Sequence, residues 1–587
     1  MSFCRGSDWR RWDLHIHTPQ TKKNDQFEGS TPQEKWDKFY EDVLTYISDD
    51  DSTKKVAVLG ITDYFSIDNY RKVISDGKLT DKFELLLPNI EMRITPVSSK
   101  AAMNIHFICN PNIVSQLDVK LFSQLTFKHS NGQTFHAVKD DFINHEKSYY
   151  NFFQYPYINK VDVHQKVEWC DRSIFYQIFV DRFHIGKTTK DISYIDKKWG
   201  ELPKPQGFFG GDIKGITEKL DYLNDLGVNS IYLTPIFQSP SNHKYDTIDY
   251  DNVDEMFGTN DDLKELVDCA HKRGMKVLLD AVFNHCSYLC KQFQDVLTKG
   301  KQSEFFDWFI IRGDKPDLNI MNYECFAACN YMPKWNTNNP EVQEFLLHIA
   351  TKWIKEYGID GWRLDVADEV SHDFWRLFRK AVKNAKADAM IIGENWHDSR
   401  PWLEGDQFDS IMNYSFTKAC LDYFAYGKMK AQQFCNRLSE ILMRNTDQVN
   451  EMMLNLLDSH DTERFLTNAE ENKSKLKCAL AVMFFFVGMP CIYYGTEIGM
   501  VGGYDPDSRR TFDWNENHWD KDLYNTVKEL IKLRKEKIKG KIRMFTEGEI
   551  FILEREKISL AVNNTDKTLK LGTTILKPQS YKILFVR

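Results

Sequence analysis

The chain has 587 residues, a net charge of −8 and 42% hydrophobic residues. This length exceeds what one ordinary core supports, so we expect several domains, and the composition excludes a disordered chain. Lysine and arginine are scattered along the chain, which argues against a nucleic-acid partner. No apolar run is long enough to cross a bilayer, and the first residues lack a secretory signal. We therefore expect a cytoplasmic protein without a membrane partner.

The cysteines point the same way. Twelve of them lie at scattered positions, which is not the pattern of a disulfide framework. The C-x3-C pairs Cys286/Cys290 and Cys325/Cys329 leave a zinc site open, although reduced cysteines are commoner in such a loop-rich stretch.

The chain changes character near residue 148. Residues 1–147 show a short α/β pattern, and an aromatic connector with turn signals follows at 148–172. From 173 to 540, buried strand-like runs alternate with helical patterns, which predicts a closed (β/α)₈ barrel. The stretch 286–340 is too long for a simple crossover and indicates an inserted subdomain. Short alternating runs from 541 to 587 suit an antiparallel β domain.

The individual elements can be placed from periodicity. In the N-terminal part we predict strands at 11–17, 55–62 and 103–109 and a helix at 32–48. The eight barrel strands are predicted at 173–180, 230–236, 276–283, 361–367, 389–394, 410–414, 452–458 and 491–497, and helices at 216–226, 261–273, 340–357 and 372–384.

Polar residues gather where the predicted barrel strands end, and active groups of such barrels lie at the carboxyl ends of strands. The third strand carries Asp280 and is followed by His285, the fourth ends at Asp365, and the fifth ends at Glu394. The seventh is followed by Asp461. Buried carboxylates are costly unless they are paired or used, so this repetition predicts a catalytic site.

Spacing separates the roles of two carboxyl groups. Arg363 and Asp365 lie two apart on a strand and share a face, so the guanidinium is expected to lower the pKa of Asp365, as a nucleophile requires. Glu394 follows two isoleucines and precedes Trp396, and such an apolar surround is expected to raise its pKa, as a general acid requires. Carboxyl groups on adjacent strand ends can approach about 5–5.5 Å, the separation of retaining enzymes.

Four motifs carry a specific resemblance: DAVFNH (280–285), GWRLDVADE (361–369), IGEN (392–395) and LLDSHD (456–461). From about 149 to 587 the chain resembles the α-amylase superfamily of glycoside hydrolases. The resemblance implies Asp365 as nucleophile, Glu394 as acid/base and Asp461 as stabiliser of the transition state. It also implies contacts to the cleaved sugar from a set of neighbours, namely Asp280, His285, Arg363 and His460.

Narrower motifs resemble the cyclomaltodextrinase, neopullulanase and maltogenic amylase group. They are YQIFVDRF (176–183), SNHKYDT (241–247), MPKWN (332–336) and GGYDPDSRR (502–510). The resemblance makes Tyr245 a stacking platform, and Asp505 and Arg509 contacts to the next sugars. It implies hydrolysis of α-1,4 bonds in cyclodextrins, short maltooligosaccharides and pullulan, with some transglycosylation and no cofactor.

Three positions depart from that group. Trp335 stands where leucine is usual and is expected to reshape an acceptor subsite. Asp368 stands where asparagine is usual, before the expected substrate-binding Glu369. Lys187 and Lys190 fall where some members bind calcium, so no calcium is expected there, because lysine only donates. A second calcium site at Asn284 stays open.

The N-terminal part resembles the first half of a PHP-type metal-dependent phosphoesterase. His15 and His17 share one face of a strand, a geometry suited to a divalent metal, and Asp63, Glu91 and His106 are candidates to complete the site. Tyr64 replaces a usual histidine, and the second half of that fold has no counterpart. A folded remnant or adaptor is the favoured interpretation, because a partial barrel leaves open strand edges.

Three functions thus remain: an α-glucan hydrolase, a metal-dependent phosphoesterase at the N-terminus, and a non-catalytic glucan-binding protein. The intact set of Asp365, Glu394 and Asp461 favours the first. The β-sandwich that dimerises the resembled group is replaced here, so the sequence decides neither for a monomer nor for a homodimer.

Overall fold

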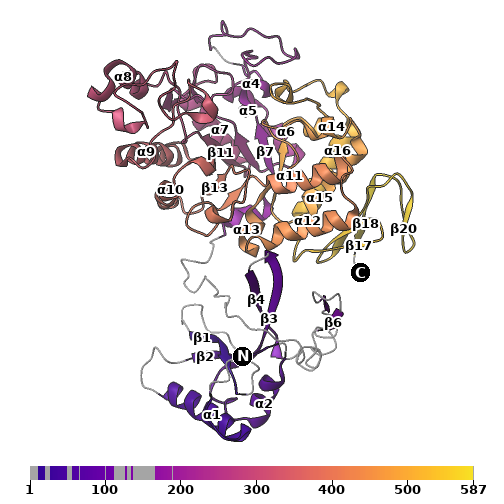
Figure 1. Cartoon of the computed structure of the whole chain (residues 1–587). Helices are drawn as coiled ribbons and strands as arrows, with labels where there is room; N and C mark the ends of the chain where they lie inside the picture. Colours follow the sequence, from indigo (N-terminus) through magenta and orange to yellow (C-terminus); the bar gives the residue numbers. More distant parts are fainter. Residues whose placement is uncertain are drawn as a thin grey trace. The chain divides into compact units, whose positions relative to one another are not determined.

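The computed structural model describes residues 11–19, 27–48, 56–64, 66–98, 101–111, 126–128, 134–136, 166–187 and 190–585. It divides into two compact units, Met1–Pro156 and Tyr157–Arg587 (Figure 1). Most of the connector expected at 148–172 lies outside the described residues. Within the described residues, no helix is long and apolar enough to span a membrane.

The N-terminal unit is built on a four-stranded sheet in the order β1-β2-β3-β4, with the first three strands parallel and β4 antiparallel. Trp36 and Phe39 of the first helix pack on Leu59 and Ile61 of β2 in one small core. The elements are β1 (Arg11–His17), α1 (Pro32–Ser48), β2 (Val56–Tyr64), α2 (Asp68–Asp76), β3 (Leu85–Ser98), β4 (Ala101–Ile108), β5 (Thr126–Lys128) and β6 (Thr134–His136).

The second unit contains the (β/α)₈ barrel. Its sheet has the order β14-β13-β12-β11-β8-β7-β16-β15, and a parallel bridge between Met412 and Leu454 closes it. Apolar side chains such as Phe175, Leu278 and Ile392 fill the interior. The strands are β7 (Phe175–Ile178), β8 (Ser230–Leu233), β11 (Lys276–Ala281), β12 (Gly361–Leu364), β13 (Met390–Gly393), β14 (Ser410–Ile411), β15 (Leu454–Leu456) and β16 (Met489–Tyr493).

Figure 1 shows helices arranged around these strands. The helix α9 begins after Asn339, whose side chain accepts two backbone N–H groups, and ends at the left-handed Gly358. The helices are α4 (Val180–Phe183), α5 (Ile213–Glu218), α6 (Leu220–Leu226), α7 (Asn260–Lys272), α9 (Pro340–Tyr357), α10 (His372–Ala385), α11 (Tyr414–Cys420), α12 (Ala431–Met443), α13 (Asp447–Met452), α14 (Phe465–Asn468), α15 (Lys473–Phe485) and α16 (Lys521–Glu536).

Two smaller parts accompany the barrel. The insertion after β11 contains α8 (Lys291–Lys299) and short 3₁₀ turns, and a hairpin of β9 (Phe237–Gln238) and β10 (Asp249–Val253) follows β8. The C-terminal strands form an antiparallel sheet in the order β17-β18-β19-β22 beside a small hairpin. They are β17 (Arg543–Glu547), β18 (Ile550–Arg555), β19 (Ile558–Asn563), β20 (Leu569–Leu571), β21 (Thr574–Leu576) and β22 (Ser580–Phe585).

The predicted barrel is confirmed, but several strands are shorter than predicted. The pairing of β12 stops at Leu364, because Val366 adopts a left-handed φ of 46° and turns the chain. The strand predicted at 452–458 begins at Leu454, because Met452 ends α13. The helix predicted at 216–226 is two helices, which meet at the non-helical Lys219.

Candidate active site

The predicted catalytic carboxyl groups all lie at the carboxyl-terminal ends of the parallel strands. Asp365 directly follows β12 and Glu394 directly follows β13, and Asp461 lies in the loop after β15. Asp365 is 5% exposed and Glu394 is 6% exposed, whereas the Asp461 side chain is 30% exposed. Two buried carboxyl groups therefore stand beside one that is partly exposed.

Arg363 connects three of the acidic side chains. Its Nη1 donates to Asp280 Oδ1 at 2.9 Å and to Asp365 Oδ1 at 2.7 Å, and its Nη2 lies 2.8 Å from Glu394 Oε2. Asp280 and Arg363 are register partners on adjacent strands, which explains the first contact. The two terminal nitrogens of one guanidinium thus hold Asp365 and Glu394 close together.

This sharing alters the expected electrostatics of Asp365. Burial raises the pKa of Asp365 well above its usual range, and the Arg363 ion pair opposes that shift while Glu394 and Asp280 add to it. Arg363 lowers this pKa as expected, but the net pKa is raised, because burial and the neighbouring carboxyl groups outweigh the arginine. Burial also raises the pKa of Asp280 to about 6, against the same arginine.

We expected an apolar environment around Glu394, but two hydrogen-bond donors contact its carboxylate. Its Oε2 accepts the backbone N–H of Val366 at 3.0 Å, and its Oε1 accepts the indole N–H of Trp396 at 3.0 Å. The left-handed Val366, a costly conformation for a β-branched residue, aims that N–H at the carboxylate. The strained backbone of Val366 therefore directly follows Asp365 and contacts Glu394.

Asp461 belongs to a second polar cluster. Its carboxylate lies 3.2 Å from His460 Nε2 and 3.4 Å from Arg509 Nη2, and Arg509 Nη1 is paired with Asp505 at 2.9 Å. Burial raises the pKa of Asp461, and Arg509 opposes that shift. The structure therefore brings Asp505, Arg509, His460 and Asp461 together as the sequence implied.

Tyr245 joins the two clusters. Its hydroxyl donates to Asp280 Oδ2 at 3.0 Å and contacts His460 Nε2, and the Tyr245 and His460 rings are parallel within 6° at 5.5 Å. His285 lies in the segment that follows β11, where burial lowers its pKa to about 3. The Tyr245 ring, whose centroid lies 6.0 Å from the Arg363 guanidinium carbon, and the buried His460 therefore lie beside the shared arginine.

The acceptor-side predictions fare differently. Trp335 is 3% exposed, its ring stacks on Phe309 at 5.0 Å, and its N–H donates to Tyr250. The expected contribution of this ring to an acceptor subsite is wrong, because the ring fills the interior of the insertion. Glu369 is half exposed and pairs with Lys334 at 2.6 Å.

Some neighbours were not singled out from the sequence as site residues. Trp396 is 48% exposed and stacks on Tyr414 with centroids 3.7 Å apart, so the pair forms an open flat surface beside Glu394. Phe326 of the insertion stacks on His285 at 4.8 Å. The position of Trp396 two residues after Glu394 is a usable signal, whereas nothing local identifies Phe326.

Lys190, at the position where some members of the resembled group bind calcium, has clear partners. The Lys190 ammonium donates to the carbonyls of Gly210 and Met256 at 2.7 and 2.9 Å and pairs with Asp212 at 2.8 Å. The Lys190 ammonium thus already contacts these oxygen atoms, which would otherwise be available as ligands for a cation. The Asn284 amide faces His285 and Glu369.

The cysteine pairs form no metal cluster in the described part of the chain, where one group of at least three metal-ligand side chains is found. That group is His15, His17 and Glu91 in the N-terminal unit. Cys286 and Cys290 lie close, with their sulfurs 3.3 Å apart.

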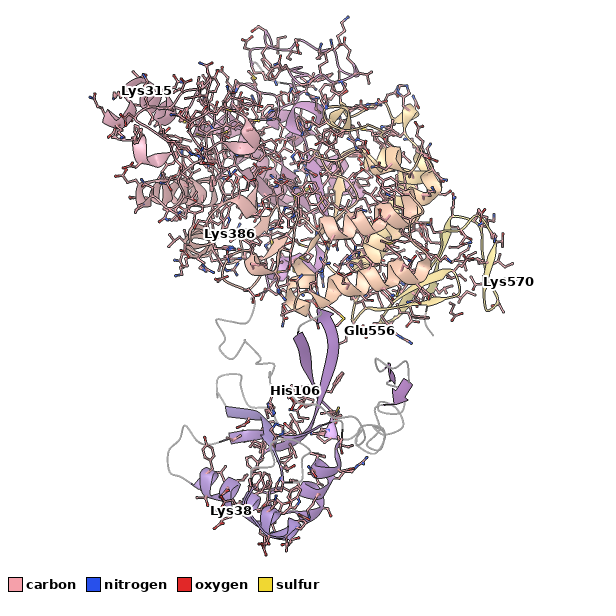
Figure 2. All side chains as sticks on the ribbon, in the orientation of Figure 1. Lys38, His106, Lys315, Lys386, Glu556 and Lys570 are labelled. Carbon is pink, nitrogen blue, oxygen red and sulfur yellow. The ribbon has the colours of Figure 1, made fainter. Side chains whose placement is uncertain are left out.

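The N-terminal group has the dimensions of a metal site. The Nε2 atoms of His15 and His17 are 2.9 Å apart, and Glu91 Oε2 lies 3.6 and 3.8 Å from them. A tetrahedral ion with bonds of about 2.0–2.2 Å separates its ligands by about 3.4 Å. His106, labelled in Figure 2, has its ring 4.7 Å from that of His15. The Asp63 side chain lies outside the described residues.

Comparison with known proteins shows the family of the chain. The model of the α-amylase catalytic domain matches residues 177–522. A cyclomaltodextrinase of Thermoanaerobacter pseudethanolicus is 49% identical over 437 residues, covering 72% of this chain and 75% of the relative. An intracellular maltogenic amylase of Bacillus subtilis is 47% identical over 401 residues, which cover 68% of this chain and 67% of the relative. A solved cyclomaltodextrinase structure is 46% identical with a TM-score of 0.68, covering 71% and 74%.

Proposed function

Because the chain belongs to the α-amylase family and is an α-glucan hydrolase of the cyclomaltodextrinase and neopullulanase type, we propose that it cleaves α-1,4 bonds with retention of anomeric configuration. The proposed substrates are cyclomaltodextrins, short maltooligosaccharides and pullulan, with some transfer to sugar acceptors. The observation that carries the proposal is the single guanidinium of Arg363, which holds Asp365 and Glu394 at its two terminal nitrogens.

In the proposed mechanism Asp365 attacks the anomeric carbon while Glu394 gives a proton to the departing glycosidic oxygen. Glu394 then takes a proton from water, which attacks the covalent intermediate and releases Asp365. Three carboxyl groups face one guanidinium, so the set is expected to retain a proton for the first step. Asp461, beside Arg509, is proposed to bind the sugar hydroxyls.

The remaining cleft residues are proposed to position the sugar. Tyr245 supplies a flat ring for the reacting unit. His285 and His460, both buried, are neutral donors or acceptors for its hydroxyls. Asp505 and Arg509 bind the next unit, and Glu369 faces the acceptor. This chemistry needs only side chains, so we expect EDTA to leave the glycosidase rate unchanged.

Asp365→Asn tests the proposal. The variant keeps the shape of the side chain but loses the nucleophile, so turnover of β-cyclodextrin should fall by roughly 10⁴-fold or more. Asp388→Asn is the matched control, because Asp388 is half exposed and precedes β13 at the opposite end of that strand. Product release by Asp365→Asn at a rate close to that of the control would refute the assignment.

Substrate preference and assembly need their own measurement. The product profile from β-cyclodextrin, pullulan and soluble starch ranks the substrates, and light scattering separates a monomer from a homodimer. The intracellular maltogenic amylase among the relatives supports a cytoplasmic location, which cell fractionation would test.

For the N-terminal unit we propose binding of one divalent metal ion, supported by the triangle of His15, His17 and Glu91. His106 is the fourth candidate, because its Nδ1 faces Asn89 Oδ1 at 3.2 Å, and its buried Nε2 has no hydrogen-bond partner among the described residues. A ligating histidine is commonly oriented through its other nitrogen in this way. Nitrogen-rich donor sets of this kind suit zinc and related transition metals.

The metal content of the purified chain tests this second proposal. Elemental analysis should give roughly one metal per chain, with loss in the variant His15→Ala/His17→Ala and retention in the control His518→Ala, an exposed histidine. Equal metal content in all three proteins would refute the site.

Two other functions have their own tests. Release of phosphate from nucleotides with added Mn²⁺ would reveal a phosphoesterase. A barrel that binds β-cyclodextrin without cleaving it would indicate a glucan-binding protein instead.

A further inference from the structure

Lys244 directly precedes Tyr245 and has an unusual environment. Its side chain is fully buried, and its backbone has a left-handed φ of 64°. Both features are unfavourable for a lysine, because burial disfavours the ammonium and a left-handed backbone is strained for a non-glycine residue. Such costs persist only where the surroundings impose them.

The ammonium of Lys244 closes the base of the loop that carries Tyr245. It pairs with Asp254 Oδ2 at 2.8 Å and donates to the Ser239 carbonyl at 3.0 Å. Asp254, directly after β10, also accepts the N–H groups of Ser239 and Met256. The Lys244 ammonium in the loop between β9 and β10 is thus held by Ser239, directly after β9, and by Asp254, directly after β10.

The left-handed turn sends consecutive side chains to different places. The Lys244 side chain enters the interior, where the ring centroid of Phe257 lies 5.0 Å from its ammonium. The next side chain, Tyr245, reaches Asp280 and the His460 ring at the barrel mouth. The position of the lysine and the position of the tyrosine ring are therefore set by the same turn.

We propose that Lys244 is a positioning residue for the proposed glycosidase reaction, which fixes the Tyr245 ring and hydroxyl against the reacting sugar through the Asp254 anchor. The inference rests on the proposed function of the barrel. It assigns to Lys244 no contact with substrate, because its ammonium is fully buried among Asp254, Ser239 and Met256. Its effect on the rate must then pass through Tyr245.

The test is a mutant cycle between the anchor and the tyrosine. Lys244→Met/Asp254→Asn removes both charges together, so no unpaired buried charge is left. We expect kcat for β-cyclodextrin to fall roughly tenfold or more, with KM changed less than about threefold. The reason is that a displaced Tyr245 ring misaligns the sugar in the transition state more than it weakens substrate binding. In a Tyr245→Ala background the same pair of changes should cost less than about twofold, because nothing remains to be positioned.

A second buried lysine provides the control. Lys190→Met/Asp212→Asn removes an ion pair of the same kind and length, whose ammonium also donates to the carbonyls of Gly210 and Met256. Met256 also contacts the Lys244–Asp254 pair, so this control disturbs a shared neighbour but leaves the Lys244 anchor itself in place. This control should lower the melting temperature and leave kcat within about threefold. Equal losses of kcat from the Lys244 pair with and without Tyr245, or no loss at all, would overturn the inference.

The wild-type rate separates this inference from the proposed function. Absence of turnover in the wild-type chain refutes the glycosidase proposal itself. A crystal structure of Lys244→Met/Asp254→Asn then still decides the positioning role, because the Tyr245 hydroxyl should leave Asp280 in the variant. Retention of the 3.0 Å contact of the wild type would overturn it.

Discussion

Arg363→Lys tests whether the planar shape of the guanidinium, rather than its charge, organises the active site. Arg363 reaches Asp280, Asp365 and Glu394 at 2.7–2.9 Å from two nitrogens in a fixed fork. Lysine presents one ammonium, which cannot reproduce this arrangement. At least one buried carboxylate then loses its partner, and breaking a buried ion pair costs about 3–5 kcal/mol.

That energy is divided between folding and catalysis. If it fell wholly on the transition state, kcat would drop by about 10²–10⁴-fold, since each 1.4 kcal/mol is a factor of ten. We expect a loss of about 10²–10³-fold in the hydrolysis of β-cyclodextrin, together with a lower melting temperature. Arg376→Lys is the control, because Arg376 also contacts two aspartates but at the surface. A kcat within about fivefold of wild type would show that charge alone suffices.

Three further outcomes are expected. Trp335→Leu should lower stability by about 2–4 kcal/mol through the cavity left in the insertion, while the product profile from β-cyclodextrin stays unchanged; a changed profile would restore the acceptor role. Burial lowers the pKa of His285 to about 3, so between about pH 6.5 and 3 only the unfolded state binds this proton. The free energy of unfolding should therefore fall by about 1.4 kcal/mol for each unit that the pH falls in this range. His285→Gln should flatten that part of a denaturant-monitored pH profile, and an unchanged slope would contradict the lowered pKa. Added calcium should leave the melting temperature of the wild type unchanged, because the Lys190 ammonium already pairs with Asp212, and a rise would show that calcium binds despite this contact, at Asn284 or elsewhere.

Local signals predicted the elements well where the residues concerned act locally. The proline after Asn339 and the glycine at 358 bracket α9, whose observed bounds are those predicted. Strand ends were harder to predict. The end of β12, for example, is set by a left-handed turn at Val366, where the sequence has no glycine to indicate a turn. The barrel itself follows from the alternation of elements, since each strand–helix unit buries its face against the next.

The site was predicted in its members but not in its electrostatics. The carboxyl groups could be placed because strand ends of a parallel barrel converge. The raised pKa of Asp365 could not, because burial and the carboxyl groups on neighbouring strands outweigh Arg363, and spacing along one strand does not contain these tertiary facts. Trp335 shows the same limit, since an aromatic residue in a binding motif and an aromatic core residue look alike in sequence.

The closing bridge of the barrel gives the sheet one narrow seam. Between β14 and β15 the pairing is reduced to Met412 with Leu454, reinforced by the side-chain contact of Asn413 with Asn455 at 2.8 Å. The strand bearing Glu394 is the inner neighbour of β14, and the loop of Asp461 leaves β15. Local opening of this seam would move Glu394 away from Asp461, so amide exchange at Asn413 would report how freely the distance between the proposed proton donor and the proposed hydroxyl-binding aspartate varies.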